Sequence, residues 1–472
     1  MPWFIAPLFS SKRILREMGP MGELPSDRTL LQETIRVAWP SILESFLTAL
    51  VTVIDTIMVS SLGPAAIAAV GLTTQPKYIC LSAFFSLNIA VSTIVARRRG
   101  EGDRAGANCV LMQALIMGVM LIAAVTTLGL TVAEPLMRLM GSNEATHELA
   151  VGYFRIIVGG MLFQAITMVI NAAQRGAGNT KIAMRTNLVS NLVNIVFNYL
   201  LIGGNLGFPA LGIRGAAIAT VLGTVAASVM ALHSVLDAHG YLCLRRKQSP
   251  VRFHYFNKPI VRSICRISAS TLLEQFFMRI GFLLFTMIVA RIGTNAFAAH
   301  QVGMDILNLS YAFGEGLSVA AVALVGRSLG EGRADLAKVY GGFCQRIGML
   351  CSAVLATAFL MCGDAIFRLF SDQEEVLEYG RTIMQLMCVI VVVQISQVIY
   401  SGCLRGGGDV RFVAMVTLVA VGCVRPLTVW LLVDLIPLGV LGAWLGQLMD
   451  QLARLVLSFC RFKHNKWLKL RV

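Results

Sequence analysis

Two carboxylic acids, Asp55 and Glu44, interrupt an apolar stretch of about 33–59 near the N-terminus. An ionisable side chain at membrane depth is costly, so it marks an ion or substrate pathway by default. Asp55 is therefore predicted to bind a coupling proton or sodium ion, unless its carboxylate merely reaches water at the helix end. Glu44 lies eleven residues earlier, three turns away on nearly the same face, which is too far for the two acids to share a proton.

Asparagines recur at helical spacing in a second apolar stretch, about 183–203. Most of them share one helix face; they are Asn187, Asn191, Asn194 and Asn198. Asp55 and Asn198 each lie about one turn from the outer end of a helix, so we expect Asn194 and Asn198 to be polar neighbours of Asp55. The alternative is that the amides only hold helices together. Apart from sodium at Asp55, no metal site is expected.

The chain contains an internal repeat with an offset of 230 residues. Its landmark residues occur in pairs, which are Glu44 and Glu274, Gln164 and Gln394, Gly100 and Gly330, and Arg175 and Arg405. Asp55, by contrast, corresponds to Phe285, so the first half alone carries this acid. The paired Glu and Gln residues are candidates for a cavity or a secondary ion site, although Glu274 can equally form a structural pair with Arg279. A duplicated apolar unit indicates a transporter.

The composition is that of a membrane protein, with 56% hydrophobic and 14% charged residues and a mean hydropathy of +0.73. The net charge of +15 comes from basic residues in short loops, so no nucleic-acid partner is expected. The eleven cysteines are scattered and predict neither disulfides nor a zinc site. The first residues do not resemble a secretory signal. The turn at 175–181 lacks phosphate-loop spacing, so no nucleotide or other cofactor is expected.

Twelve apolar segments are long enough to span a bilayer, six in each repeat. They lie at about 33–59, 66–96, 107–131, 149–173, 183–203, 214–237, 264–291, 296–326, 338–362, 379–403, 411–433 and 439–461. We therefore predict an all-α integral membrane protein with two six-helix lobes. An even number of spans per repeat gives the lobes parallel topology, related by a pseudo-two-fold axis along the membrane normal.

Loop charges predict the orientation and the domain boundaries. Basic loops alternate with loops poor in Lys and Arg, so both termini of this multi-pass protein are placed in the cytoplasm and the chain in the inner (plasma) membrane. The basic loops include Arg97-Arg98-Arg99, Arg245-Arg246-Lys247 with Arg252, and the tail from Arg461 to Arg471, and Asp372 lies in an acidic loop. The predicted parts are a tail at 1–30, a lobe at 31–238, a linker at 239–262, a lobe at 263–461 and a basic tail at 462–472.

Other charged residues within the spans are candidates for buried pairs. Asp450 and Arg454 have the spacing of a structural ion pair on one helix. Further candidates are Asp305, Glu315 and Arg425.

The ordered set of motifs on this duplicated frame resembles the multidrug and toxic compound extrusion family over nearly the whole chain. The motifs are Trp39-Pro40, Asp55-Thr56-Ile57-Met58-Val59 with Leu62-Gly63, the turn from Arg175 to Lys181, Asn191-Leu192-Val193-Asn194, Ala299-His300-Gln301, Leu404-Arg405-Gly406, and Asp450 with Arg454. The resemblance implies a V-shaped pair of lobes and efflux of organic, often cationic, compounds coupled to proton or sodium entry. It also implies that Asp55 and Asn194 match the proton-coupled branch, in which a second aspartate often stands at Asn198. Gln394 replaces a carboxylate of the sodium-coupled branch.

The sequence is compatible with three classes of function. The first is an ion-coupled exporter of small organic compounds, cationic or amphipathic, acting as a monomer in the bilayer. The second is a flippase for a lipid-linked glycan, which would need more basic residues in its cavity than Arg279 and Arg425. The third is a membrane-embedded enzyme, which would need a clustered His/Asp, Ser/His or metal constellation at membrane depth. Of the histidines, only His233 and His300 lie in or near the spans, and neither belongs to such a cluster. The chain is therefore predicted not to be an enzyme.

Overall fold

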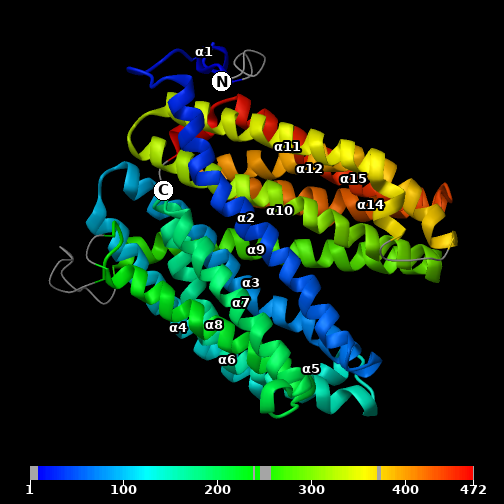
Figure 1. Cartoon of the computed structure of the whole chain (residues 1–472). Coiled ribbons are helices and arrows are strands. Elements are labelled where there is room, and N and C mark those ends of the chain that lie inside the picture. Colours follow the sequence, from blue (N-terminus) through cyan, green and yellow to red (C-terminus); the bar gives the residue numbers. More distant parts are fainter. Residues whose placement is uncertain (1–8, 17, 238–239, 245–256, 369–373, 471–472) are drawn as a thin grey trace. The chain divides into compact units, whose positions relative to one another are not determined.

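The computed structural model describes the chain except residues 1–8, 17, 238–239, 245–256, 369–373 and 471–472. The described residues form helices and turns, with no strand among them (Figure 1). The predicted basic cluster at 245–247, Arg252, Asp372 and Arg471 therefore lie outside the described residues.

Six long helices form in each half of the chain at the predicted segments. In the first half they are α2 (Asp27–Ser60), α3 (Pro64–Gly100), α4 (Arg104–Thr131), α6 (Glu144–Gly176), α7 (Thr180–Gly203) and α8 (Gly212–Leu236). In the second half they are α9 (Lys258–Ile292), α10 (Thr294–Gly330), α11 (Ala334–Arg368), α12 (Glu374–Gly406), a composite helix over residues 410–435, and α15 (Gly439–Lys463). The starts of α3 and α10, and likewise of α4 and α11, lie 230 positions apart, as the repeat predicts.

Eleven of the described helices are long and apolar enough to cross a membrane. The twelfth predicted segment forms α15, which at 25 residues is as long as α8 but more polar. Its buried polar side chains include Gln447, Asp450, Gln451 and Arg454. The all-α membrane fold predicted from the sequence is confirmed.

The helices extend beyond the apolar segments because polar residues form their ends. Asp103 accepts a hydrogen bond from the Gly106 amide at the start of α4, and Asn143 forms a capping box with Thr146 at the start of α6. The turn between α6 and α7 requires a left-handed residue, which Gly178 supplies at φ +77°. The predicted tight helix–helix turn at 175–181 is therefore present.

The composite helix at 410–435 departs from regular α-geometry in two places. It begins as α13 (Val410–Val419), widens into a π turn at η3 (Ala420–Val424), returns to α14 (Arg425–Trp430), and widens again at η4 (Leu431–Leu435). A π turn accommodates one more residue than an α turn and often lies at a functional site. Short helices occur elsewhere; they are α1 (Ser11–Ile14), α5 (Ala133–Leu139), η2 (Asn205–Gly207) and η5 (Lys466–Lys469).

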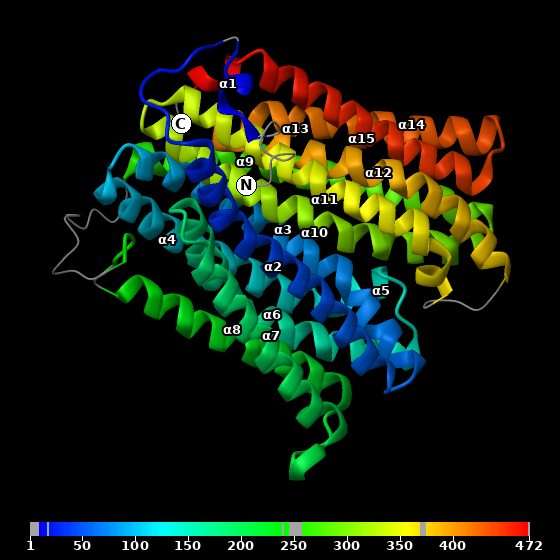
Figure 2. The same cartoon turned by 45° about the horizontal axis from the view of Figure 1, so that its top comes forward.

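The chain folds into two compact units. Unit 1 comprises Met1–Ser45 with Ala269–Val472, and unit 2 comprises Phe46–Ser268. Within unit 1, α12 packs against α10, α11 and α15 (Figure 1). Within unit 2, α6 packs against α3, α4 and α8 (Figure 2). The boundaries of the predicted lobes remain a prediction.

The first half of α2 belongs to unit 1 because it is bound to α10 and α11. Glu33 accepts a hydrogen bond from Arg327 at 2.8 Å and another from the Tyr340 hydroxyl. At Gly316 of α10, an added Cβ would lie 2.5 Å from the backbone of Ile42. This close approach explains why a glycine is needed where the two helices meet.

Candidate functional site: a carboxylate and two amides in unit 2

The predicted acid of unit 2 lies against the asparagine face of α7. Asn198 donates a hydrogen bond from Nδ2 to Oδ1 of Asp55 at 2.8 Å. Asn198 is 2% exposed, while Asp55 is half-buried. The two residues are 143 positions apart in the chain, and the structure brings them into contact.

Asn194 completes this polar group. With its oxygen facing Thr220 of α8, the Asn194 amide accepts from the Thr220 hydroxyl at 3.1 Å and donates to the Asp55 carboxylate at 2.7 and 3.3 Å. Both asparagines thus present N–H groups to one carboxylate, which stabilises its charged form. The other asparagines of the predicted face, Asn187 and Asn191, are only half-buried.

Two further residues lie within electrostatic range of Asp55, and the sequence analysis did not identify them. The ammonium group of Lys77, on α3, exerts an electrostatic effect on the carboxylate, and Tyr153 of α6 lies in the range of the Asp55 charge. Lys77 could have been found by the rule that singled out Asp55, because it too is an ionisable residue inside an apolar segment. Tyr153 and Thr220 are ordinary helix residues that carry no such signal.

Glu274, the predicted secondary site, forms an ion pair within unit 1. Its Oε1 accepts from Nη2 of Arg405 at 2.6 Å and from the Thr417 hydroxyl at 3.1 Å. The partner is thus Arg405 at the end of α12, and not Arg279 as the local spacing had indicated. Glu274 is 3% exposed, so its charge is balanced inside the unit.

The remaining predicted site residues are distributed over both units. Glu44 is 8% exposed and belongs to unit 1, whereas Asp55 belongs to unit 2. Gln394 is buried in α12, and its Oε1 has no hydrogen-bond partner among the described residues. Gln164 of α6 is half-buried. Their predicted role in a cavity remains a prediction.

A buried charged cluster joins α14 to α15. Asp450 accepts from Arg454 at 3.0 Å, which confirms the pair predicted from their spacing. The same Oδ2 atom accepts from Nε of Arg425 at 3.1 Å and from its Nη2. Arg425 and Asp450 are both fully buried, so two guanidinium groups share one carboxylate in the interior of unit 1.

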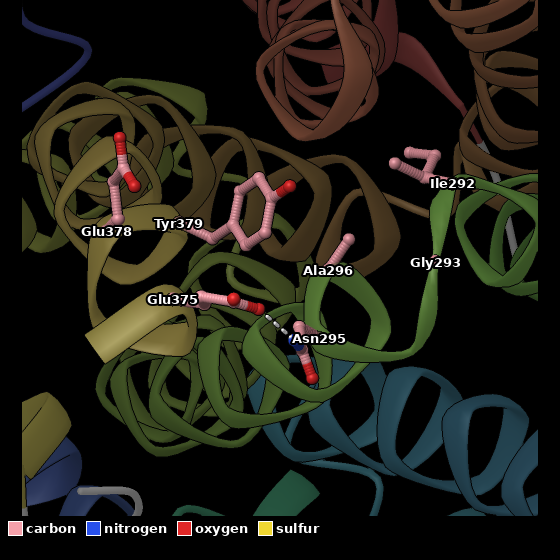
Figure 3. A pocket seen from close by; sticks show the side chains of 7 residues that line it. All are labelled: Ile292, Gly293, Asn295, Ala296, Glu375, Glu378 and Tyr379. Atoms are coloured by element: carbon pink, nitrogen blue, oxygen red, sulfur yellow. Dashed lines mark hydrogen bonds between the residues drawn. The ribbon is translucent and has the colours of Figure 1, made fainter. Parts of the chain in front are cut away.

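A separate pocket of about 230 Å³ lies at the N-terminal ends of α10 and α12. Figure 3 shows Asn295 pointing at Glu375, to which it donates a hydrogen bond, with the Tyr379 ring beside them. The other lining residues are Ile292, Gly293, Ala296 and Glu378. None of the predicted site residues lines this pocket.

The protein family is decided by a match to a family model in both halves of the chain. The MatE model matches residues 40–200 and again residues 271–431, so one unit of sequence occurs twice. The chain belongs to the MatE family. This membership confirms the resemblance stated from the motifs and makes the chain a membrane transporter rather than an enzyme.

Curated MatE relatives match over almost their full length. The chain is 26% identical over 458 residues to the probable multidrug resistance protein NorM of Thermotoga maritima, covering 96% of each chain. It is 26% identical to the multidrug resistance protein MdtK of Edwardsiella ictaluri, covering 92% of this chain and 95% of MdtK. The chain is therefore similar over nearly its full length to bacterial proteins named for multidrug resistance.

Solved MatE structures share the fold. A MATE transporter in complex with MaL6 gives a TM-score of 0.86 at 22% identity, covering 97% of this chain and 98% of the other. A transporter of the MOP superfamily from Pyrococcus furiosus, described as having a binding pocket of reversed polarity and a different function, gives 0.86 at 23% identity, covering 98% and 99%. At these identities the likeness establishes the fold alone.

Proposed function

We propose that this chain is a secondary active exporter that couples entry of a proton or sodium ion to efflux of small organic compounds. The observation that carries the proposal is the Asp55 carboxylate of unit 2, held between the amides of Asn194 and Asn198. An acid kept at membrane depth with polar neighbours on other helices has the chemistry that a coupling cation needs.

The amide groups supply a means of sensing the cation. In the arrangement described, both amide nitrogens face the carboxylate and stabilise its charged form. A protonated Asp55 needs an acceptor instead, and a sodium ion needs oxygen ligands. Rotation of an amide about its last bond exchanges nitrogen for oxygen, and the buried Oδ1 of Asn198 has no hydrogen-bond partner among the described residues. Cation binding therefore neutralises Asp55 and rearranges the amides.

Neutralisation provides the coupling step. It removes the cost of holding a charge in a medium of low dielectric constant, so α2 can repack against its neighbours and close the outward pathway. Cargo is released outside as that pathway closes, before the cation reaches the cytoplasm, which is alternating access. Because Glu274 is already balanced by Arg405 at 2.6 Å, Asp55 is the better coupling residue of the two.

The relatives support the proposed cargo, and the loop charges support the proposed orientation in the membrane. Relatives with the names of multidrug resistance proteins support organic compounds, cationic or amphipathic, as cargo. The basic loops support cytoplasmic termini for this inner-membrane protein. We propose that the chain acts as a monomer and needs no cofactor.

A lipid-linked glycan flippase is the competing transporter. It would need cationic side chains available for a pyrophosphate. Arg405 is paired with Glu274 and Arg425 with Asp450, and the carboxylates of both pairs are buried. A guanidinium group engaged in this way is a poor ligand for a second anion, so these contacts favour the exporter.

The test is an efflux assay in proteoliposomes, with proton and sodium gradients imposed separately. Asp55→Asn should abolish gradient-driven export of a fluorescent organic cation while leaving cargo binding intact, because the carboxylate that takes up the cation is gone. Asp364→Asn is the matched control, since Asp364 lies near the end of α11 with its side chain 60% exposed. Export by Asp55→Asn at the parent rate under both gradients would place the coupling site elsewhere.

A further inference from the structure

The two halves of the chain allow the polar site of unit 2 to be compared with its counterpart in unit 1. After the first π turn, the repeat register shifts by one residue. In unit 2 the Leu211 amide donates to the Leu201 carbonyl at 2.9 Å, and in unit 1 the Leu438 amide donates to the Leu432 carbonyl at 2.9 Å. Leu201 and Leu432 are equivalent by this bond and lie 231 positions apart. The π turn at 420–424 accounts for the extra residue.

A second contact fixes the same register. A Cβ added at Gly215 would lie 2.5 Å from the Leu201 oxygen, and one added at Gly442 would lie 2.6 Å from the Leu432 oxygen. The composite helix and α15 therefore pack as α7 and α8 do. In this register the counterpart of Asn194 is Arg425, and the counterpart of Asn198 is Val429.

The counterpart of the polar site has neither the carboxylate nor the two amides of unit 2. Phe285, which stands at the repeat position of Asp55, forms one buried hydrophobic cluster with Val429 and Ala443. The carboxylate of unit 2 is thus replaced by a ring, and one of its two amides by an aliphatic side chain. The other amide is replaced by the guanidinium group of Arg425.

The Arg425 guanidinium is held as a bound cation would be. Its central carbon lies 4.5 Å from the centre of the Phe282 ring and 5.6 Å from that of Phe285. Aromatic faces attract cations at this range. Asp450 supplies the compensating negative charge through bonds to Nε and Nη2.

We propose that Arg425 is a resident cation, which fills in unit 1 the position that a coupling cation takes in unit 2. It makes coupling one-sided, because the counterpart site is permanently charged and closed to a second cation. Arg454 adds a further positive charge on Asp450 at 3.0 Å, so the cluster repels another cation. The statement about coupling rests on the proposed function of Asp55. The statement that the Arg425 guanidinium occupies a cation-binding site does not rest on it.

The experiment replaces the resident cation with a soluble one. Arg425→Ala removes the guanidinium and leaves Phe282, Phe285 and Asp450 in place. The purified variant should be stabilised by millimolar methylguanidinium, seen as a concentration-dependent rise in Tm, because a ligand that binds only the folded state raises its stability. The parent protein should show no such rise, and the rise should be lost in Arg425→Ala/Asp450→Asn.

Arg454→Ala is the matched control, because it removes the other guanidinium partner of Asp450 and leaves Arg425 in its place. No rise in Tm is expected for this variant. An equal rise in Arg454→Ala and Arg425→Ala would assign the effect to Asp450 alone and overturn the proposal, as would no rise in Arg425→Ala. Asp55 is intact in all of these proteins, so their behaviour is independent of the efflux result for Asp55→Asn.

A second comparison holds even if Arg425→Ala does not fold. Arg425→Lys keeps a positive charge at the site, and Arg425→Met keeps a side chain of similar length without the charge. The lysine variant should have the higher Tm, because the methionine variant leaves the buried Asp450 with one cation fewer. A methionine variant at least as stable as the lysine variant would show that no cation is required there.

Discussion

The ion pair between Glu274 and Arg405 gives the sharpest stability prediction. Nη2 of Arg405 lies 2.6 Å from Oε1 of Glu274, and the two side chains are 16% and 3% exposed. Removing one partner of a buried pair leaves a desolvated charge and typically costs about 3–5 kcal/mol. Arg405→Met should therefore lower the free energy of unfolding by that amount.

The pair between Arg155 and Glu134 is the matched control. Its N–O distance is similar, 2.9 Å, but its side chains are 49% and 53% exposed. Exposed pairs contribute about 0–1 kcal/mol, so Arg155→Met should have little effect. Two ion pairs of nearly equal length should thus differ several-fold in their contribution to stability, because only one of them is desolvated.

The assay is reversible unfolding in mixed detergent micelles, followed by circular dichroism. Glu274→Gln/Arg405→Met should recover most of the loss, since an uncharged amide then replaces the unpaired carboxylate. The double-mutant cycle should show a coupling energy well above about 0.5 kcal/mol. If Arg405→Met and Arg155→Met unfold with the same free energy, the Glu274 carboxylate is hydrated and the reasoning from burial is wrong.

Three further outcomes can be measured. Gly176→Ala should lower the Tm because the added Cβ would lie 2.5 Å from a backbone oxygen of α3, whereas Gly159→Ala in the same helix meets nothing within 4 Å and should be neutral or stabilising. In a cysteine-free background, an impermeant maleimide should label Leu139→Cys in intact cells and label Glu101→Cys only after permeabilisation, because the loop charges place these turns on opposite sides. Asn198→Asp should alter the dependence of efflux on the gradient without abolishing transport; a complete loss would mean that the amide itself is required.

Much of the fold could be predicted because membrane helices must satisfy their own backbone hydrogen bonds, so long apolar segments are helical. The segment predicted at about 183–203 forms α7 over Thr180–Gly203. The short helix α5 could not be predicted, because seven residues carry too little periodicity. The π turns could not be predicted either, since they depend on how the composite helix packs against α15.

Some contacts of the candidate site could likewise be predicted from the sequence, and others could not. The contact between Asp55 and Asn198 was predictable because two helix ends at one depth were compared, although its role in coupling remains a prediction. The pair of Asp450 with Arg454 was predictable from spacing on one helix. The partner of Glu274 was not, because Arg405 lies 131 positions away and reaches it only through helix packing.

The π turn at 420–424 also bears on how the duplicated halves diverged. A helix can absorb an inserted residue as a local bulge, so neither its first turn nor the next helix has to move. A gap-free alignment of the halves pairs Asn194 with Val424, and it therefore conceals the correspondence between Asn194 and Arg425. Once the gap is placed inside the helix, the exchange of an amide for Arg425 is visible between the two copies of the repeat.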